Sequence, residues 1–396
     1  MKALNDNAHP LESLLQQHCP NGVEFKELGE VCETLPKGTL KTSQLTANGY
    51  PVINSGRDLY GYYSKFNNES NAFTIAARGE YAGFVNFMDS KFWAGGLCYP
   101  YRSNDENKLL TKFIYYHLKT NESNIMDSLV ARGSIPAINK KDIDKKLKIP
   151  IPPLEIQQKI VDILDAFTEL QVELQVELQA RRKQYEYYRN KLLSFEELQR
   201  RTDMLNGGGL KLVSLGELGK RNAGTKITAN QMQALHKENA PIRIFAGGST
   251  IADVDYRDLP KKDVIDKPSI ICKARGYIGF EYYDKPFSHK SEFWSYTIEK
   301  NANQKFIYYF LVNQQEYFQQ IAKANSVKIP QLKVKNTDNF QIPLPPLAVQ
   351  NDIVELLDKF DTLTNDLTSG IPAEIEARKK QYEYYRERLL SFIAKD

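Results

Sequence analysis

RRKQYEYYRNKLLSF, the stretch from Arg181 to Phe195, returns 197 residues later as RKKQYEYYRERLLSF, from Arg378 to Phe392. The two stretches are identical at 12 of 15 positions, and the chain has 396 residues, so the period of the repeat is half of the length. Such a period indicates two versions of one unit in tandem, each closing with the same segment. We call these stretches the first and second closing segments. Two similar units suggest a target with two similar halves.

The duplication extends upstream of the closing segments. IPIPPL at Ile149–Leu154 returns as IPLPPL at Ile342–Leu347, and KFIYY at Lys112–Tyr116 returns unchanged at Lys305–Tyr309. Each repeat is therefore a body whose sequence differs between the repeats, followed by a tail whose sequence is similar in both. We place an N-terminal leader at 1–21, the first body at 22–150, the first tail at 151–205, the second body at 206–342 and the second tail at 343–396.

Composition excludes several classes of protein. With 41% hydrophobic residues the chain is typical of globular proteins, and no stretch approaches the ~20 apolar residues of a membrane span. Met1–Pro20 lacks the apolar run of a secretory signal. The four cysteines are scattered, which favours reduced thiols over disulfides or a zinc site. We therefore expect a cytoplasmic protein.

The net charge of +4 is unevenly spread. Leu210–Gln341 contains 20 Lys and Arg against 13 Asp and Glu, and Gly22–Lys148 contains 17 against 14. Leu154–Arg200 contains 7 against 9. Basic bodies and a slightly acidic tail are expected if the bodies bind nucleic-acid phosphates and the tails contact proteins.

The tails have the pattern of long amphipathic helices. Apolar residues recur at a spacing of three and four from Ile156 to Leu178, and neither Gly nor Pro occurs from Leu154 to Met204. The pattern predicts a helix of about 45 residues, or roughly 68 Å. A helix of this length needs a partner for its apolar stripe, and Leu347–Phe392 is the obvious partner. We expect the tails to pair as a coiled coil rather than to lie as independent surface helices.

The first tail contains a tandem tetrapeptide, QVELQVEL, at Gln171–Leu178. Each copy adds about 6 Å of helix, so the repeat is suited to a spacer, although a merely stable helix would also show it. The second tail instead contains Thr368–Pro372 (TSGIP), which predicts a break near Gly370.

The bodies have the pattern of short strands and loops with two helices. The predicted strands, with the small polar turn residues that end the first and third, lie at 51–56, 73–77, 242–248 and 269–272, and the predicted helices lie at 112–118 and 305–311. An Arg-Gly pair follows the second strand of each body, at Arg78-Gly79 and Arg275-Gly276. Such a turn places a planar donor beside a glycine that lets backbone approach a ligand, which suits phosphate or guanine. A surface salt bridge is the competing use of each arginine.

The residues that covalent chemistry requires are not arranged for it. The sequence has no P-loop, its five histidines have no metal-ligand spacing, and no Ser/His/Asp set can be argued. The pairs Pro152-Pro153 and Pro345-Pro346 follow Ile or Leu, whereas an adenine methyltransferase needs Asp, Asn or Ser before them. We expect a protein that performs no catalysis.

Tandem divergent bodies, each followed by an IPxPPLxxQ helix that ends in a near-copy of RKxQYEYYRxxLLSF, resemble the specificity subunit (HsdS) of type I restriction-modification systems. The resemblance implies an α+β chain with two tandem target-recognition domains, each reading one half of a bipartite site in double-stranded DNA. It implies an antiparallel pair of helices that separates them and docks two modification (methyltransferase) subunits. It further implies that S-adenosylmethionine, ATP and Mg²⁺ belong to the modification and restriction (translocase) subunits, and that this chain binds no cofactor.

We select base-reading candidates from the polar residues of the loops. In the first body they are Lys37, Thr39, Asn54, Ser55, Arg57, Arg78, Tyr81, Arg132 and Ser134, and in the second Lys226, Thr228, Gly248, Ser249, Thr250, Lys273, Arg275, Tyr277, Asn325, Ser326 and Lys328.

The tyrosines of the closing segments have three possible uses. They could stack on bases, form a packed junction, or dock a partner protein. Residues i, i+2 and i+3 of a helix do not share one narrow face, which disfavours stacking on bases. The docking candidates are Tyr185, Tyr188, Arg189, Tyr382, Tyr385 and Arg386.

Two alternative functions stay open at this point. One is a scaffold that joins two proteins without reading DNA, and the other, which the sequence favours less, is a stand-alone adenine methyltransferase. Binding of duplex DNA would separate the first from the main interpretation, and binding of S-adenosylmethionine would support the second.

Overall fold

The computed structural model describes residues 19–205, 208–299, 302–326, 328–392 and 394, so most of the predicted leader lies outside the described residues. The chain divides into two compact units. The first unit contains Met1–Gln175 and Glu374–Asp396, and the second unit contains Val176–Ala373. The units are therefore not the sequence repeats. Each closing segment belongs to the unit that holds the body of the other repeat.

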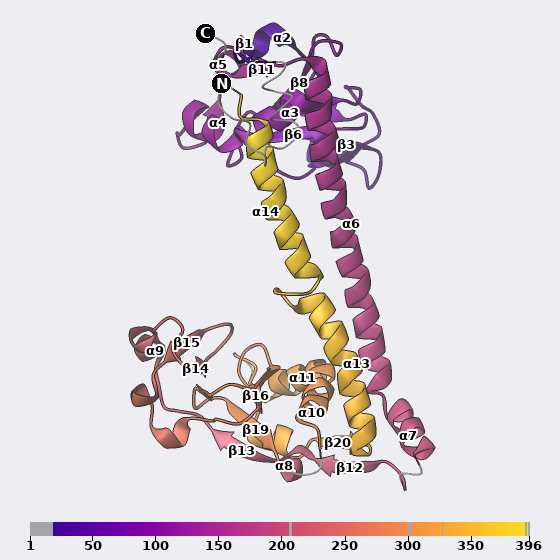
Figure 1. Ribbon diagram of the computed structural model, residues 1–396, viewed down its shortest axis with the longest axis vertical. Helices are drawn as coiled ribbons and strands as arrows, with labels where there is room; N and C mark the ends of the chain where they lie inside the picture. Colours follow the sequence, from indigo (N-terminus) through magenta and orange to yellow (C-terminus); the bar gives the residue numbers. More distant parts are fainter. Residues whose placement is uncertain (1–18, 206–207, 300–301, 327, 393, 395–396) are drawn as a thin grey trace. The chain divides into compact units, whose positions relative to one another are not determined.

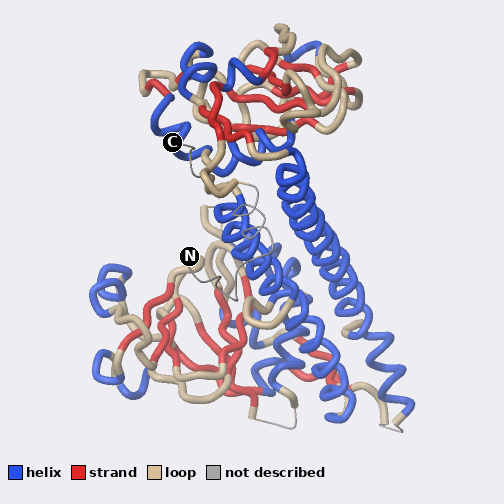
Figure 2. The backbone as a smooth tube through the Cα atoms, turned by 45° about the horizontal axis from the view of Figure 1, so that its top comes forward, coloured by secondary structure: helices blue, strands red, loops and turns tan. Residues whose placement is uncertain are grey.

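The first body contains two sheets and two two-stranded ribbons (Figure 2). Its elements are β1 (Glu24–Glu27), α2 (Leu28–Val31), β2 (Cys32–Thr34), η1 (Thr42–Gln44), β3 (Tyr50–Ile53), β4 (Gly61–Tyr63), β5 (Ala72–Ala76), β6 (Val85–Met88), β7 (Trp93–Ala94), β8 (Cys98–Ser103), α3 (Thr111–Thr120), α4 (Glu122–Leu129), β9 (Val130–Ala131), β10 (Ala137–Ile138), α5 (Lys140–Lys146) and β11 (Lys148–Ile151). The sheets have the strand orders β2-β8-β5-β6 and β4-β3-β7, and the ribbons are β1-β11 and β9-β10.

The second body repeats this topology. Its elements are β12 (Lys211–Ser214), α8 (Leu215–Leu218), β13 (Gly219–Ala223), α9 (Ala229–Leu235), β14 (Ile242–Phe245), β15 (Ile251–Val254), η2 (Tyr256–Asp258), η3 (Lys261–Asp263), β16 (Ser269–Lys273), β17 (Gly279–Tyr283), β18 (Phe287–His289), β19 (Trp294–Ile298), α10 (Gln304–Asn313), α11 (Gln315–Asn325), α12 (Val334–Asp338) and β20 (Gln341–Leu344). The strand orders are β13-β19-β16-β17 and β15-β14-β18, and β12 pairs with β20. The predicted strands and helices of both bodies are confirmed, with ends that differ by a few residues.

The predicted helix of the first tail ends earlier than expected. α6 (Leu154–Leu192) contains 39 residues rather than the predicted length of about 45, and a separate helix follows as α7 (Phe195–Met204). The cause is Ser194, whose hydroxyl accepts a hydrogen bond from the backbone N–H of Glu197 at 3.3 Å and so caps α7. Ser194 with Glu197 is an S-x-x-E pattern that marks a helix start, and it interrupts a run with neither Gly nor Pro.

The predicted break in the second tail is confirmed. The tail consists of α13 (Leu347–Asn365) and α14 (Ile371–Leu389). Between them the carboxylate of Asp366 accepts hydrogen bonds from Thr368 N–H and from the Ser369 hydroxyl, both at 2.7 Å. A side chain at Gly370 would place its Cβ 2.3 Å from the carbonyl oxygen of Thr362, so only glycine fits there. Asp366 and Gly370 therefore determine the break between the two helices.

Each unit pairs helices from both tails. In the first unit α14 lies beside the N-terminal part of α6 and runs in the opposite direction (Figure 1). Leu389 and Leu390 join the core that contains Phe113 and Leu164. The predicted pairing of the two tails is thus found in this unit, between parts that are far apart in the sequence.

The second unit uses the same arrangement, with the C-terminal part of α6 beside α13 (Figure 1). Leu192 and Leu193 join the core that contains Phe306 and Leu357. The tandem tetrapeptide lies within α6, where Leu174 and Leu178 are buried and Val172 and Val176 are exposed. The boundary between the two units falls inside this repeat.

None of the described helices is both long enough and apolar enough to span a membrane.

Candidate nucleic-acid interface

The Arg-Gly turn of the first body closes on a loop from another part of the chain. Arg78 forms a β-bridge with Ala137, and the N–H of Gly79 donates to the carbonyl of Pro136 at 2.9 Å. Gly79 has a φ of 102°, a left-handed conformation that favours glycine. The turn therefore brings the exposed Arg78 beside the segment that carries the candidates Arg132 and Ser134.

Two further candidates of the first body extend this cluster. The guanidinium carbon of Arg57 lies 5.6 Å from the ring centroid of Tyr81, at the distance of a cation–π contact. Tyr81 follows the Arg-Gly turn by two residues, so this contact joins the exposed Arg57 to the segment that continues from the exposed Arg78. Arg132 is less available, since its guanidinium lies 2.7 Å from the exposed carboxylate of Asp127.

The remaining candidates of the first body gather at the turn before β8. Lys37 Nζ donates to the carbonyl of Gly96 at 3.1 Å, and Asn54 Oδ1 accepts from the N–H of Leu97 at 2.8 Å. Thr39 and Ser55 flank these contacts in the sequence. The N–H of Ala77 donates to the carbonyl of Leu97 at 2.8 Å, which joins this turn to the Arg-Gly turn. The structure thus gathers the first-body candidates around two linked turns.

The second body builds its Arg-Gly turn in the same way. Arg275 forms a β-bridge with Gln331, and the N–H of Gly276 donates to the carbonyl of Pro330 at 2.8 Å. Gly276 has a φ of 81°, and Tyr277 beside it is 78% exposed. An exposed aromatic ring next to an exposed arginine is well suited to contact with a nucleic acid.

A second tight turn of this body holds three more candidates. The N–H of Ala246 donates to the carbonyl of Thr250 at 3.0 Å, so Gly248, Ser249 and Thr250 form an exposed turn between β14 and β15. Lys273 is already engaged, because its Nζ lies 2.6 Å from the carboxylate of Glu281. We therefore regard the turn as more available than Lys273.

The side chains of three base-reading candidates form hydrogen bonds with the backbone that stabilise the fold. Thr228 caps α9 by accepting from the N–H of Gln231. Asn325 donates to the carbonyl of Gln331 at 3.2 Å, and Asn54 holds Leu97 as described. Ser326 and Lys328 lie on the same segment as Asn325, ahead of Pro330, and Lys328 is exposed.

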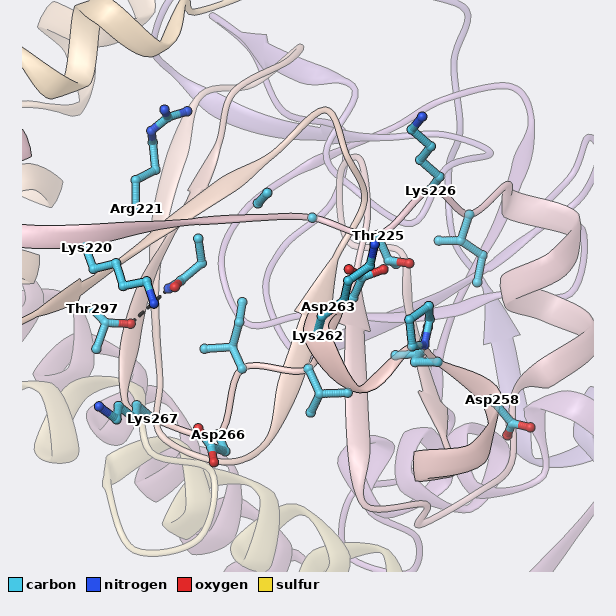
Figure 3. A pocket seen from close by; sticks show the side chains of 18 of the residues that line it. Lys220, Arg221, Thr225, Lys226, Asp258, Lys262, Asp263, Asp266, Lys267 and Thr297 are labelled. Atoms are coloured by element: carbon cyan, nitrogen blue, oxygen red, sulfur yellow. Dashed lines mark hydrogen bonds between the residues drawn. The ribbon is translucent and has the colours of Figure 1, made fainter.

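Lys226 lines a cavity of about 1100 Å³ in the second body (Figure 3). The cavity lies between β13 and the segment that contains η2 and η3. Five cations line it, Lys220, Arg221, Lys226, Lys262 and Lys267, together with four carboxylates, Asp258, Asp263, Asp266 and Glu299. This mixed charge favours neither an anion nor a metal cation.

The described residues contain no group of three or more His, Cys, Asp and Glu side chains that could hold a metal ion. The described cysteines are all free. Burial raises the pKa of the Cys98 thiol to about 12, which opposes formation of the reactive thiolate. The described part of the chain therefore presents no metal cluster to which a reaction could be assigned.

The first and third tyrosines of each closing segment pack against a phenylalanine of the same unit. In the second unit Tyr185 and Tyr188 stack on Phe360, with ring centroids 6.2 and 5.6 Å away. Burial is the largest cause of a raised Tyr185 pKa. Arg189 lies over the Tyr185 ring and donates to Asn313 Oδ1 at 3.2 Å. These docking candidates thus serve a packed junction.

The first unit has the equivalent junction. Phe167 contacts Tyr382 and Tyr385, with centroid distances of 6.2 and 5.7 Å, and Arg386 lies over the Tyr382 ring. The middle tyrosines point outward instead, and Tyr187 and Tyr384 are 60% and 55% exposed. The most exposed tyrosines of the closing segments are therefore the two middle ones, which the docking candidates do not include.

Sequence reasoning also missed the loops that face the Arg-Gly turns. Ile135-Pro136 and Ile329-Pro330 supply the carbonyls that hold these turns, and both isoleucines are exposed. The signal was present, because the same Ile-Pro pair follows the helical part of each body. A repeated dipeptide in otherwise divergent bodies marks a shared backbone geometry.

Comparison with known proteins assigns this architecture to a family. Residues 20–181 and 208–377 match the type I restriction modification DNA specificity domain, so the chain belongs to this family. It is 31% identical over 398 residues to the type I restriction enzyme EcoR124I/EcoR124II specificity subunit of Escherichia coli, with 93% of this chain and 94% of that chain covered. The predicted resemblance is confirmed.

Two further relatives agree. A Haemophilus influenzae chain, provisionally named a type I restriction enzyme specificity subunit, is 31% identical over 418 residues and covers 98% of this chain and 100% of its own length. The solved S subunit of a type I restriction-modification system from M. genitalium superposes with a TM-score of 0.66 at 21% identity, covering 99% of both chains. This structural likeness confirms the fold.

Proposed function

We propose that the chain is the non-catalytic DNA-specificity subunit of a type I restriction-modification enzyme, with one body for each half of a bipartite site. The observation that carries the proposal is the Arg-Gly turn, which both bodies build on the same backbone hydrogen bond to an Ile-Pro loop. Around this shared turn the exposed side chains differ. A common frame with different side chains is expected of two domains that bind one kind of ligand and read different sequences.

The side chains that we assign to base reading are those that the fold leaves available. They are Arg57, Arg78, Tyr81 and Ser134 in the first body, and Ser249, Thr250, Arg275, Tyr277 and Lys328 in the second. Arginine forms two hydrogen bonds with the major-groove edge of guanine, and exposed loop hydroxyls accept or donate to either base. Lys37 is better suited to phosphate, which carries no sequence information.

Two modification subunits and a restriction subunit complete the enzyme in this proposal. They would supply S-adenosylmethionine-dependent methylation of adenine and ATP- and Mg²⁺-dependent cleavage, as the family resemblance implies. Tyr187 and Tyr384 are exposed at the same position of the two nearly identical closing segments. They would therefore offer equivalent contacts to two copies of one partner. The assembly would operate in the cytoplasm, where its DNA is.

Binding of duplex DNA by the subunit in complex with its modification subunits tests the proposal. We expect tight, sequence-dependent binding to duplexes with a bipartite site, identified by methylome sequencing of the host. Binding that depends on salt but not on sequence would contradict base reading. Failure to bind any duplex while both protein partners still assemble would favour the scaffold function.

A further inference from the structure

KFIYY, the pentapeptide that is identical in both bodies, ties each body to the tail that follows it. In the first unit α3 presents Lys112 and Tyr116 on one face, four residues apart. Lys112 Nζ lies 2.7 Å from Asp165 Oδ2, and the Tyr116 hydroxyl donates to Asp165 Oδ1 at 2.5 Å. One carboxylate of α6 thus binds two donors of the body.

The second unit contains the same three-residue clamp. Lys305 Nζ lies 2.7 Å from Asp358 Oδ2, and the Tyr309 hydroxyl donates to Asp358 Oδ1 at 2.6 Å. The bodies have diverged in their loops, yet these contacts agree within 0.1 Å. Stability alone is a weak reason for this agreement, because the lysines and aspartates are about one-third exposed and such ion pairs contribute little.

Each tail is held at a second point near the start of its helix. Gln157 Oε1 accepts from the N–H of Leu110 at 2.8 Å, and Gln350 Oε1 accepts from the N–H of Asn303 at 2.7 Å. Both glutamines are buried. The glutamine and the aspartate of each tail are eight residues apart, or about 12 Å along the helix. Two directional contacts at this separation define both the register and the rotation of the body on its helix.

The apolar contacts between body and tail define the register and the rotation of the body less sharply than these hydrogen bonds do. Ile160 and Leu164 are fully buried, but apolar packing has no direction and recurs with each turn of the helix. A slip by one turn moves the body about 5.4 Å, which is between one and two base pairs at 3.4 Å each. Such a slip would leave the buried Tyr116 hydroxyl without its acceptor, and an unpaired buried polar group is costly.

From this geometry we infer that Asp165 and Asp358 are positioning residues: each orients its body on the helix and thereby sets the number of base pairs between the two half-sites that the subunit accepts. The inference rests on the proposed function. Neither aspartate contacts DNA in this role, since both act through the bodies that they hold.

The test compares gap preference with stability in the complete complex with its modification subunits. The variants are Asp165→Ala and Asp358→Ala, and the matched controls are Asp162→Ala and Asp352→Ala, at exposed positions of the same helices. Binding is measured on duplexes whose gap is changed by one or two base pairs in either direction. We expect each clamp variant to lose about tenfold in its preference for the original gap, with unchanged base preference within each half-site, while the controls keep the preference.

Two further variants keep the inference testable if an alanine variant unfolds. Asp165→Asn and Asp358→Asn retain an acceptor for Tyr116 and Tyr309, respectively, and should each lose only part of the preference. A clamp variant that is merely less stable, with the gap preference of the wild type, would overturn the inference. A wild-type complex without any gap preference would instead overturn the proposed function.

Discussion

The two compact units share their helical frame and differ in the loops that surround it. Both units have the same strand orders, and both place two tyrosines of a closing segment on one phenylalanine, Phe167 or Phe360. The first unit adds the hairpin β9-β10 beside its Arg-Gly turn, whereas the second adds α9, η2 and η3. The difference shows that the helix junction and the divergent loops are separate parts of each unit, so that the loops can differ without disturbing the helix junction.

The largest expected effect is the loss of stability caused by substitutions in the closing segments, because each segment packs in the unit that holds the body of the other repeat. Leu193 follows the first body in the sequence but packs in the second unit, and Leu390 packs in the first. We expect Leu193→Ala to destabilise the second unit and Leu390→Ala the first, each by about 2–5 kcal/mol, because both side chains are buried.

Hydrogen exchange that resolves the two units is the measurement for these variants. Val172→Ala, at an exposed position of α6, is a suitable control and should change neither unit. If Leu193→Ala lowered protection in the first unit instead, the exchange of segments would be wrong.

The two units should respond to acid through His117 in the first unit and His289 in the second. Burial lowers the pKa of His117 in the first unit and of His289 in the second to about 4, below the ordinary 6.5. The unfolded chain then takes up protons first as the pH falls, so stability is present above pH 6.5 and is lost towards pH 4. At pH 5 the loss should be about 2 kcal/mol per unit.

Unfolding by denaturant at pH 7 and pH 5 measures this loss. His117→Gln should remove the pH dependence from the first unit only, and His289→Gln from the second only. Equal pH dependence in wild type and both variants would show that other groups are responsible.

The Arg-Gly turns should affect one half-site each. We expect Arg78→Ala to cost about 1–3 kcal/mol of binding and to relax a single base position in one half-site, and Arg275→Ala to do the same in the other. Binding to libraries randomised in one half-site at a time is the measurement. Arg132→Ala, which removes an arginine already paired with Asp127, is the control. A uniform loss across all sequences that fades at high salt would make the arginines phosphate contacts.

The smallest energetic effect is expected from the spacer. Deletion of Gln175–Leu178 removes about 6 Å of α6 and should shorten the preferred gap by one or two base pairs, with base preference unchanged. Methylation of sites with different gaps by the complete enzyme is the measurement. An unchanged gap would show that the tandem tetrapeptide is only a stable stretch of helix.

The sequence predicted the helices and strands better than it predicted which segments pack against one another. Periodicity placed the helices, and the repeated Arg-Gly pair marked turns that the structure shows to be equivalent. Periodicity could not show which body each closing segment covers, because two nearly identical stripes would fit either core. Polar loop residues such as Asn54 and Thr228 looked available, but their side chains bind backbone groups. The partner of Asn54 is Leu97, which only the folded chain brings near, whereas Thr228 caps α9 locally through the N–H of Gln231. The missed start of α7 at Ser194 was readable from its capping pattern.

The two units also differ in continuity. The second unit is one uninterrupted stretch, whereas the first is completed by Leu389 and Leu390, which are synthesised after the whole of the second unit. On the ribosome the first body must therefore wait with part of its core uncovered while the second unit can already fold. We therefore expect the usual order of domain folding, from the N-terminus onward, to be reversed for this chain. Chaperone binding during synthesis should accordingly concentrate on the first body and end when the second closing segment emerges.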